Sequence, residues 1–222
     1  MIEDLLFEVS EALKWPVLIA VLLALLWAIV EVGALLVEIS RRRHRSVFAL
    51  ERAVETCRAY LAAGQRNEAL GALLAASHSS QMSDAVSGIF EQLGRPDAEA
   101  RVAKRLAEYD YLSLRRLERT RVLVRFGPAL GLMGTLIPLS PALAGLADGD
   151  VETLTENLRV AFGVTVAGLL VGAIAFTVSL IRDRLYAQDY SDVEYMAATL
   201  TGDPLPYPPA ADAVATEQAF RV

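Results

Sequence analysis

The amino-acid sequence predicts an all-α membrane protein with three transmembrane helices. A helical cytoplasmic insertion is expected between the first and the second of these, and long helices are expected to continue from the membrane into the cytoplasm. Hydrophobic residues make up 54 % of the 222-residue chain, and three apolar stretches reach the roughly 20 residues that a helix needs to cross a bilayer. The charges are also segregated, because residues 41–125 hold 16 Lys and Arg against 10 Asp and Glu while the whole chain has a formal net charge of −6. This segregation is typical of membrane topology and argues against nucleic-acid binding.

The three apolar stretches run from about Trp15 to Val37, from about Phe126 to Ala147 and from about Val160 to Ile181. The leading segment MIEDLLFEVSEALK is acidic and no small-residue cleavage site follows, so we expect a retained anchor and not a cleaved signal peptide. The predicted parts of the chain are an extracytoplasmic N-terminal segment (1–14), a first span (15–39), a cytoplasmic helical domain (40–121), a second span (122–147), a short extracytoplasmic loop (148–157), a third span (158–181), a cytoplasmic helix (182–200) and a disordered Pro/Ala-rich tail (201–222).

Basic residues set the predicted orientation of the spans. RRRHR (41–45) directly follows the first span, RRLERTRVLVR (115–125) precedes the second, and Arg182 and Arg184 follow the third. The other side of the membrane receives the acidic N-terminus and the loop ADGDVETLTEN (147–157). Because Lys and Arg favour the cytoplasmic side, we expect a multi-pass protein of the cell's inner membrane, with its N-terminus outside and its C-terminus in the cytoplasm.

The predicted insertion is helical throughout. SVFALERAVETCRAYLAAG (46–64) has apolar residues at helical spacing and ends at Gly64, and NEALGALLAAS (67–77) and SDAVSGIFEQLG (83–94) predict two short helices. A further helix is expected to begin at Pro96 and to run into the second span, since neither Gly nor Pro occurs again before Gly127. The charged residues are interpreted as solvated helix faces with i,i+4 pairs such as Glu91–Arg95.

The sequence holds no pattern of an enzyme or of a cofactor site. It has no Gly-rich phosphate loop, no nucleophile elbow and no paired carboxylates in a credible pocket. His44 and His78 have no Cys or His neighbour at metal-ligand spacing, and Cys57 is the one cysteine. We therefore expect neither catalysis, nor a metal, nor a cofactor.

Small residues recur at helical spacing along the second and third spans. In the second span they are Gly127, Gly131, Gly134, Pro138, Pro141 and Gly145. In the third they are Ala161, Thr165, Gly168, Gly172, Ala175 and Ser179. Such stripes let helix backbones approach closely where lipid supplies no hydrophobic force between helices. Gly127, Gly131, Gly134, Gly168 and Gly172 are therefore predicted to pack these two helices together, and further packing between subunits is expected.

Polar residues and prolines on the same faces predict an ion path. Pro138 has no N–H, so the carbonyl of Gly134 loses its usual partner, and such breaks survive in a membrane only where protein or water satisfies the freed group. Thr135, Thr165, Ser140 and Pro138 are the candidate lining residues. In the alternative, both threonines donate to carbonyls of their own helices, as threonines in membrane helices often do.

Glu31 is the only carboxylate inside one of the three apolar stretches. An intramembrane acid is a candidate functional residue, although its place near the cytoplasmic end also suits an interhelical hydrogen bond or snorkelling to the interface. The second and third spans contain no Asp, Glu, His or Lys. A proton path built on them therefore needs a titratable group from another chain.

Two segments resemble motifs of the MotA/TolQ/ExbB proton-channel family. GPALGLMGTL (127–136) is similar to its AP-x-LGLLGTV segment, and AFGVTVAGLLVGAIA (161–175) to its AL-x-x-T-x-x-GL-x-x-AIPA segment. The resemblance implies a homopentamer around a dimer of a small single-span membrane protein of the ExbD/TolR/MotB type. It also implies that this partner carries the proton-accepting Asp, that Thr135 and Thr165 line the pore, and that ion flow drives rotation. The chain differs from the family pattern at Val160, where a Glu is common, and at Ile174, which replaces the proline of AIPA.

The leading hypothesis is thus an ion-conducting stator subunit of a motor driven by the protonmotive force, of the kind that serves protein transport, uptake, envelope maintenance, motility or defence. The alternative is a non-conducting helical membrane scaffold that recruits a cytoplasmic partner. A single-span companion with an intramembrane Asp is expected only under the first hypothesis.

Overall fold

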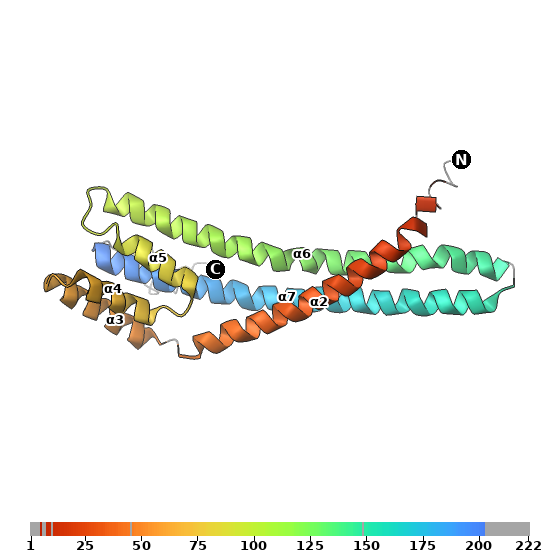
Figure 1. Cartoon of the computed structure of the whole chain (residues 1–222), viewed down its shortest axis with the longest axis horizontal. Coiled ribbons are helices and arrows are strands. Elements are labelled where there is room, and N and C mark those ends of the chain that lie inside the picture. Colours follow the sequence, from red (N-terminus) through yellow and green to blue (C-terminus); the bar gives the residue numbers. More distant parts are fainter. Residues whose placement is uncertain (1–4, 6–7, 10, 45, 148, 203–222) are drawn as a thin grey trace, which may run out of the picture. The chain divides into compact units, whose positions relative to one another are not determined.

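The computed structural model describes residues 5, 8–9, 11–44, 46–147 and 149–202, and within these every regular element is a helix (Figure 1). Three helices are long and apolar enough to cross a membrane: α2 (Lys14–Arg41), α6 (Ala98–Ala147) and α7 (Val151–Thr201). The predicted all-α class with three spans is confirmed. Most of the predicted tail, from residue 203 onward, and much of the N-terminal segment lie outside the described residues.

The chain divides into two compact units. The span unit comprises residues Met1–Ser40 and Ser113–Leu185, and the insertion unit comprises residues Arg41–Leu112 and Tyr186–Val222. Both α6 and α7 continue without a break from one unit into the other. The predicted continuous helix leading into the second span is therefore present as α6.

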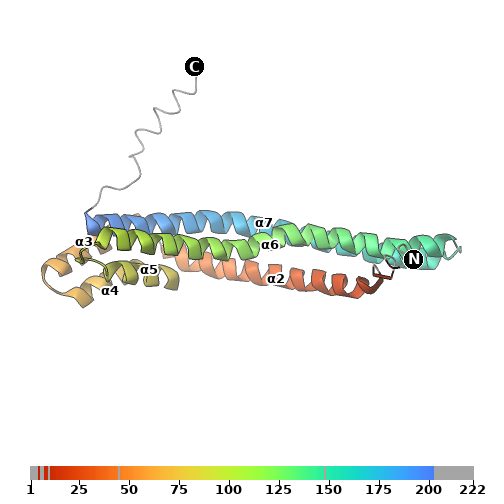
Figure 2. The same cartoon turned by 90° about the horizontal axis from the view of Figure 1, so that it is seen from above.

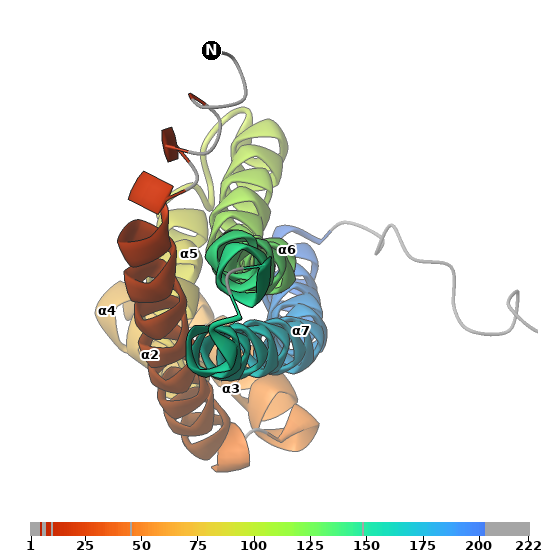
Figure 3. The ribbon, with the colours of Figure 1, turned by 90° about the vertical axis from the view of Figure 1, so that its right-hand side faces the viewer.

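The span unit is built from α2 and from the membrane parts of α6 and α7. Ala24 and Ala28 of α2 are buried with Leu123 of α6 and with Val171 and Ala175 of α7. Figure 3 looks along the helices and shows these three elements next to one another. Large apolar side chains of all three helices point outward and are exposed, as expected for surfaces that face lipid or further protein chains.

The insertion unit contains α3 (Val47–Ala62), α4 (Arg66–Ala76) and α5 (Ser80–Phe90), together with the adjoining parts of α6 and α7. A 3-10 turn, η1 (Arg42–His44), leads into it from α2. Its core includes Cys57, Leu73, Met82 and Met196, each 2 % exposed or less. Burial raises the pKa of the Cys57 thiol, which fits the predicted role of that cysteine as a small core residue.

Glycine and serine define the ends of the insertion helices. Gly64 has φ of +76°, and the backbone N–H groups of Gly64 and Gln65 donate to the carbonyls of Leu61 and Tyr60. This is the arrangement that closes a helix with a left-handed glycine. Ser79 caps α5, since its hydroxyl accepts the backbone N–H of Met82 at 3.2 Å.

The segment between α5 and α6 differs from the prediction. Helix α5 ends at Phe90, so Glu91 and Arg95 lie outside the helix and the predicted helical i,i+4 spacing does not apply to them. Helix α6 begins at Ala98 rather than at Pro96, after Asp97 with a left-handed φ of 64°. Local turn geometry, which hydrophobic periodicity does not report, ends the helical pattern here.

Candidate functional site

The glycines of the two spans bring the backbones of α6 and α7 into contact (Figure 2). A Cβ atom on Gly168 would lie 2.6 Å from the carbonyl oxygen of Gly127 and 2.7 Å from Cα of Gly131. A Cβ atom on Gly131 would in turn lie 3.3 Å from the carbonyl oxygen of Thr165. At these positions the two backbones are in contact and leave no room for a Cβ atom.

The contact extends in both directions along the helices. A Cβ atom on Gly172 would meet the ring of Pro128 at 2.9 Å, and one on Gly134 would meet the side chain of Val164 at 2.1 Å. All five glycines predicted for helix packing therefore lie at close approaches between α6 and α7 of one chain. This part of the stripe is covered within the chain and is not available to line a passage.

Both candidate threonines donate to their own helices. Thr135 Oγ1 donates to the carbonyl of Leu132 at 2.7 Å, and Thr165 Oγ1 donates to the carbonyl of Ala161 at 3.0 Å. Both side chains are half-buried. A hydroxyl that donates one hydrogen bond keeps lone pairs that accept others, so each threonine is still able to accept a hydrogen bond from water or from another chain.

The prolines do not interrupt α6, which is helical across Pro128, Pro138 and Pro141. Pro138 is fully buried and Ser140 is half-buried. Because Pro138 lacks an N–H, the Gly134 carbonyl cannot accept its usual backbone bond. The second span thus places a backbone acceptor one residue before Thr135.

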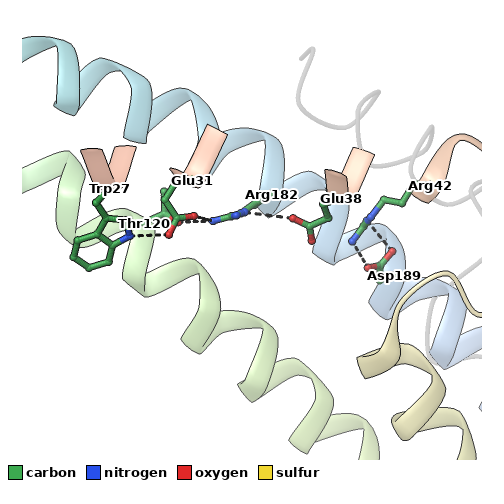
Figure 4. Close-up of polar contacts among 7 residues, drawn as sticks. All are labelled: Trp27, Glu31, Glu38, Arg42, Thr120, Arg182 and Asp189. Carbon is green, nitrogen blue, oxygen red and sulfur yellow. Dashed lines mark hydrogen bonds and ion pairs between the residues drawn. The ribbon is translucent and has the colours of Figure 1, made fainter. Parts of the chain in front are cut away.

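Glu31 takes part in a network of charged and polar side chains in the span unit, in which Arg182 and Thr120 are buried and Glu31 and Glu38 are half-buried. Figure 4 shows Arg182 of α7 between Glu31 and Glu38 of α2. Nη1 of Arg182 donates to Glu31 Oε2 and, at 2.8 Å, to the hydroxyl of Thr120 on α6, while its Nε donates to Glu38 Oε2 at 3.4 Å. The indole N–H of Trp27 donates to Glu31 Oε1 at 2.9 Å. We call these five residues the Arg182 cluster.

Sequence reasoning missed Arg182 as a member of a site. The sequence predicted this arginine only as a cytoplasmic charge that orients the third span. In the structure its side chain is 9 % exposed and pairs with Glu31. The signal available in the sequence was the position of Glu31, a carboxylate in an apolar helix, since such a group needs a cationic partner. Nothing in the sequence indicates which arginine supplies it.

The insertion unit has a second buried charged group, centred on Asp189 of α7. Arg42 donates to both carboxylate oxygens of Asp189, at 2.9 and 2.5 Å, and Nε2 of His78 lies 2.7 Å from Oδ1. The Arg42 guanidinium lies 6.0 Å from the centre of the Tyr186 ring. Burial, and next the charge of Asp189, raise the pKa of Tyr109 well above its usual range. Arg42 belongs to the RRRHR run, and because its side chain is buried, the interpretation of the charged residues as solvated helix faces is wrong for this residue.

No group of three or more His, Cys, Asp or Glu side chains suited to a metal ion occurs in the described part of the chain. The contacts of these residues are hydrogen bonds and ion pairs. These are the functions that polar groups serve inside a membrane helix bundle.

Comparison of the sequence with models of known protein families identifies the family of this chain. The profile of the MotA/TolQ/ExbB proton channel family matches residues 70–193, which is more than half of the chain. The chain belongs to this family. The match runs from α4 into α7 and includes both glycine segments. No curated protein and no solved structure matches the chain. Family membership and the three apolar helices together make it a multi-pass membrane protein of the proton-channel type.

Proposed function

We propose that this chain is the ion-conducting subunit of a motor complex driven by the protonmotive force. Five copies surround a dimer of a small single-span partner, and an Asp of that partner accepts the proton. The complex lies in the inner membrane, with the N-terminus outside and the insertion unit and C-terminus in the cytoplasm. Each charge that crosses the membrane releases about 2.3 kcal/mol per 100 mV, which is enough for successive transfers to perform mechanical work.

The observation that carries this proposal is the absence of Asp, Glu, His and Lys from residues 126–147 and 160–181 of a proton-channel family member. A proton path along these helices has hydroxyls and a freed carbonyl but no titratable group. The second and third spans therefore need an acceptor from elsewhere, and in this proposal a single-span partner with one intramembrane Asp supplies it.

The contact between α6 and α7 supports an oligomer. Because their backbones touch at Gly127, Gly131 and Gly168, a passage between the two helices of one chain would require them to separate. A passage between neighbouring chains requires no such change. The half-buried Thr135, Thr165 and Ser140 are the hydroxyls available to line it.

The test is ion flux into proteoliposomes that contain the full chain purified with its co-expressed partner. We expect Thr135→Val or Thr165→Val to reduce flux at least tenfold while the assembled complex keeps its size, and Thr135→Ser to retain flux. Thr177→Val is the matched control. Thr177 also lies in the third span and donates to a carbonyl of its own helix, that of Ala173 at 3.0 Å, but it is not a predicted lining residue. Equal loss of flux in the control, or loss of assembly together with flux, would contradict the proposal.

The second candidate function is a non-conducting scaffold, and the local hydrogen bonds of Thr135 and Thr165 favour it. A scaffold needs no single-span companion with an intramembrane acid. Purification of the chain from native membranes separates the two functions. A five-to-two complex with such a companion supports the motor, and a stable assembly of this chain alone, without flux, supports the scaffold.

A further inference from the structure

We propose that Glu31 and Arg182 form a permanent charge lock that fixes α2 to α6 and α7, and that Glu31 is not a proton carrier. Arg182 is the positioning residue of this lock. The proposal rests on the proposed function only where ion flux is the measured quantity.

Three helices meet in the lock. Glu31 and Glu38 are seven residues apart and therefore lie on one face of α2, Thr120 comes from α6 and Arg182 from α7. The apolar core that α2 shares with the other two helices is small and rich in alanine. Since lipid supplies no hydrophobic force between helices, polar contacts of this kind determine where a membrane helix docks.

The hydrogen bonds of Glu31 argue against proton transfer by this residue. One carboxylate oxygen accepts from Trp27 and the other from Arg182. These two hydrogen bonds, one to each carboxylate oxygen, hold the Glu31 side chain in one orientation beside Arg182. A carboxylate held in this way is suited to a fixed role.

The charges of the cluster predict an unequal response to substitution. With Arg182 between Glu31 and Glu38, the three side chains sum to −1. Arg182→Gln leaves two neighbouring carboxylates without the cation that they share, whereas Glu31→Gln leaves Arg182 paired with Glu38. The first change is therefore expected to be much more damaging. In the double variant the sum returns to −1, so Glu31→Gln is expected to repair part of the damage caused by Arg182→Gln.

A neighbouring ion pair supplies the matched control. Arg121 and Asp183, each the next residue after a member of the cluster, form an ion pair at 3.3 Å whose side chains are 53 % and 56 % exposed. Exposed pairs contribute little to stability. Arg121 belongs to α6 and Asp183 to α7. Arg121→Gln and Asp183→Asn therefore change charges on two of the three helices of the lock without altering a residue of the lock itself.

The experiment measures thermal unfolding and proton flux of the full-length complex for the four variants Glu31→Gln, Arg182→Gln, their double and Asp183→Asn. Arg182→Gln is expected to lower the midpoint of unfolding by on the order of 10 °C and to reduce flux in parallel. Glu31→Gln is expected to have a smaller effect, the double variant to recover more than half of both losses, and Asp183→Asn to behave like the wild type.

Two outcomes would overturn the lock. In the first, Arg182→Gln is no more damaging than Asp183→Asn. In the second, Glu31→Gln abolishes flux and the double variant regains stability but not flux, which would make Glu31 a carrier. A wild-type complex without flux would contradict the proposed motor function instead, and the recovery of stability in the double variant would then decide on the lock by itself.

Discussion

The contact between α6 and α7 makes a quantitative prediction for Gly168→Ala. The new Cβ atom would lie 2.6 Å from the carbonyl oxygen of Gly127 and 2.7 Å from Cα of Gly131. Carbon atoms in favourable contact are about 3.5–4.0 Å apart, so the helices must separate by about 1 Å. Both obstructing atoms belong to the backbone, and no rotamer change relieves the clash. Substitutions that overfill a packed contact cost about 1–3 kcal/mol.

Gly163→Ala is the control for this prediction, since a Cβ atom there meets nothing within 4 Å. Both variants gain the helix propensity of alanine, about 1 kcal/mol over glycine, so their difference isolates the packing cost. We expect Gly168→Ala to be less stable than Gly163→Ala by about 2 kcal/mol. The assay is reversible unfolding in mild detergent with increasing dodecyl sulfate, followed by circular dichroism. Equal stability of the two variants would refute the claim that backbone contact at Gly168 joins the spans.

Three further predictions concern the rest of the chain. Asp189→Asn leaves Arg42 without its buried carboxylate and is expected to destabilise the protein by about 3–5 kcal/mol, measured by thermal unfolding; an unchanged transition would contradict the buried pair. Because burial raises the pKa of the Cys57 thiol, alkylation at pH 8 should be far slower in the folded protein than in denaturant, and mass spectrometry after a timed pulse checks this. Hydrogen bonds from Thr153 lower the pKa of Asp150, so its contribution to stability is present above the usual carboxyl pKa and is lost as the pH falls through the lowered value. The unfolding midpoints of the wild type and of Asp150→Asn should therefore differ at neutral pH and converge in acid.

Much of the fold was predictable because it depends on local patterns. Hydropathy and segment length predicted the three spans, and Gly64 predicted the end of the first insertion helix. The spacing of glycines such as Gly131 and Gly168 predicted a close helix pair. Each of these signals lies within one segment of the chain, and each reflects a single physical requirement, either transfer to lipid or room for a backbone.

The charged clusters were not predictable in the same way. Arg42 and Asp189 are 147 positions apart, and Arg182 and Glu31 are 151 apart. Their pairing depends on how helices dock. The sequence places several arginines near the predicted cytoplasmic ends of the spans and does not indicate which of them pairs with a given carboxylate. Whether Thr135 and Thr165 face a passage depends on neighbouring chains, so that part of the site stays a prediction.

Arg42 and Arg182 have a consequence for the biosynthesis of this protein. In the proposed orientation both arginines lie at cytoplasmic ends of spans, where positive charge retains a loop on that side while the chain is inserted. In the folded protein the same two guanidinium groups are buried and form ion pairs, Arg42 with Asp189 and Arg182 with Glu31. One side chain thus acts first as a topology signal and later as an internal counter-ion. Replacing either arginine by lysine would distinguish the two roles. Lysine keeps the positive charge that orients the span, but it cannot reproduce the several directed hydrogen bonds of the guanidinium group in the folded protein.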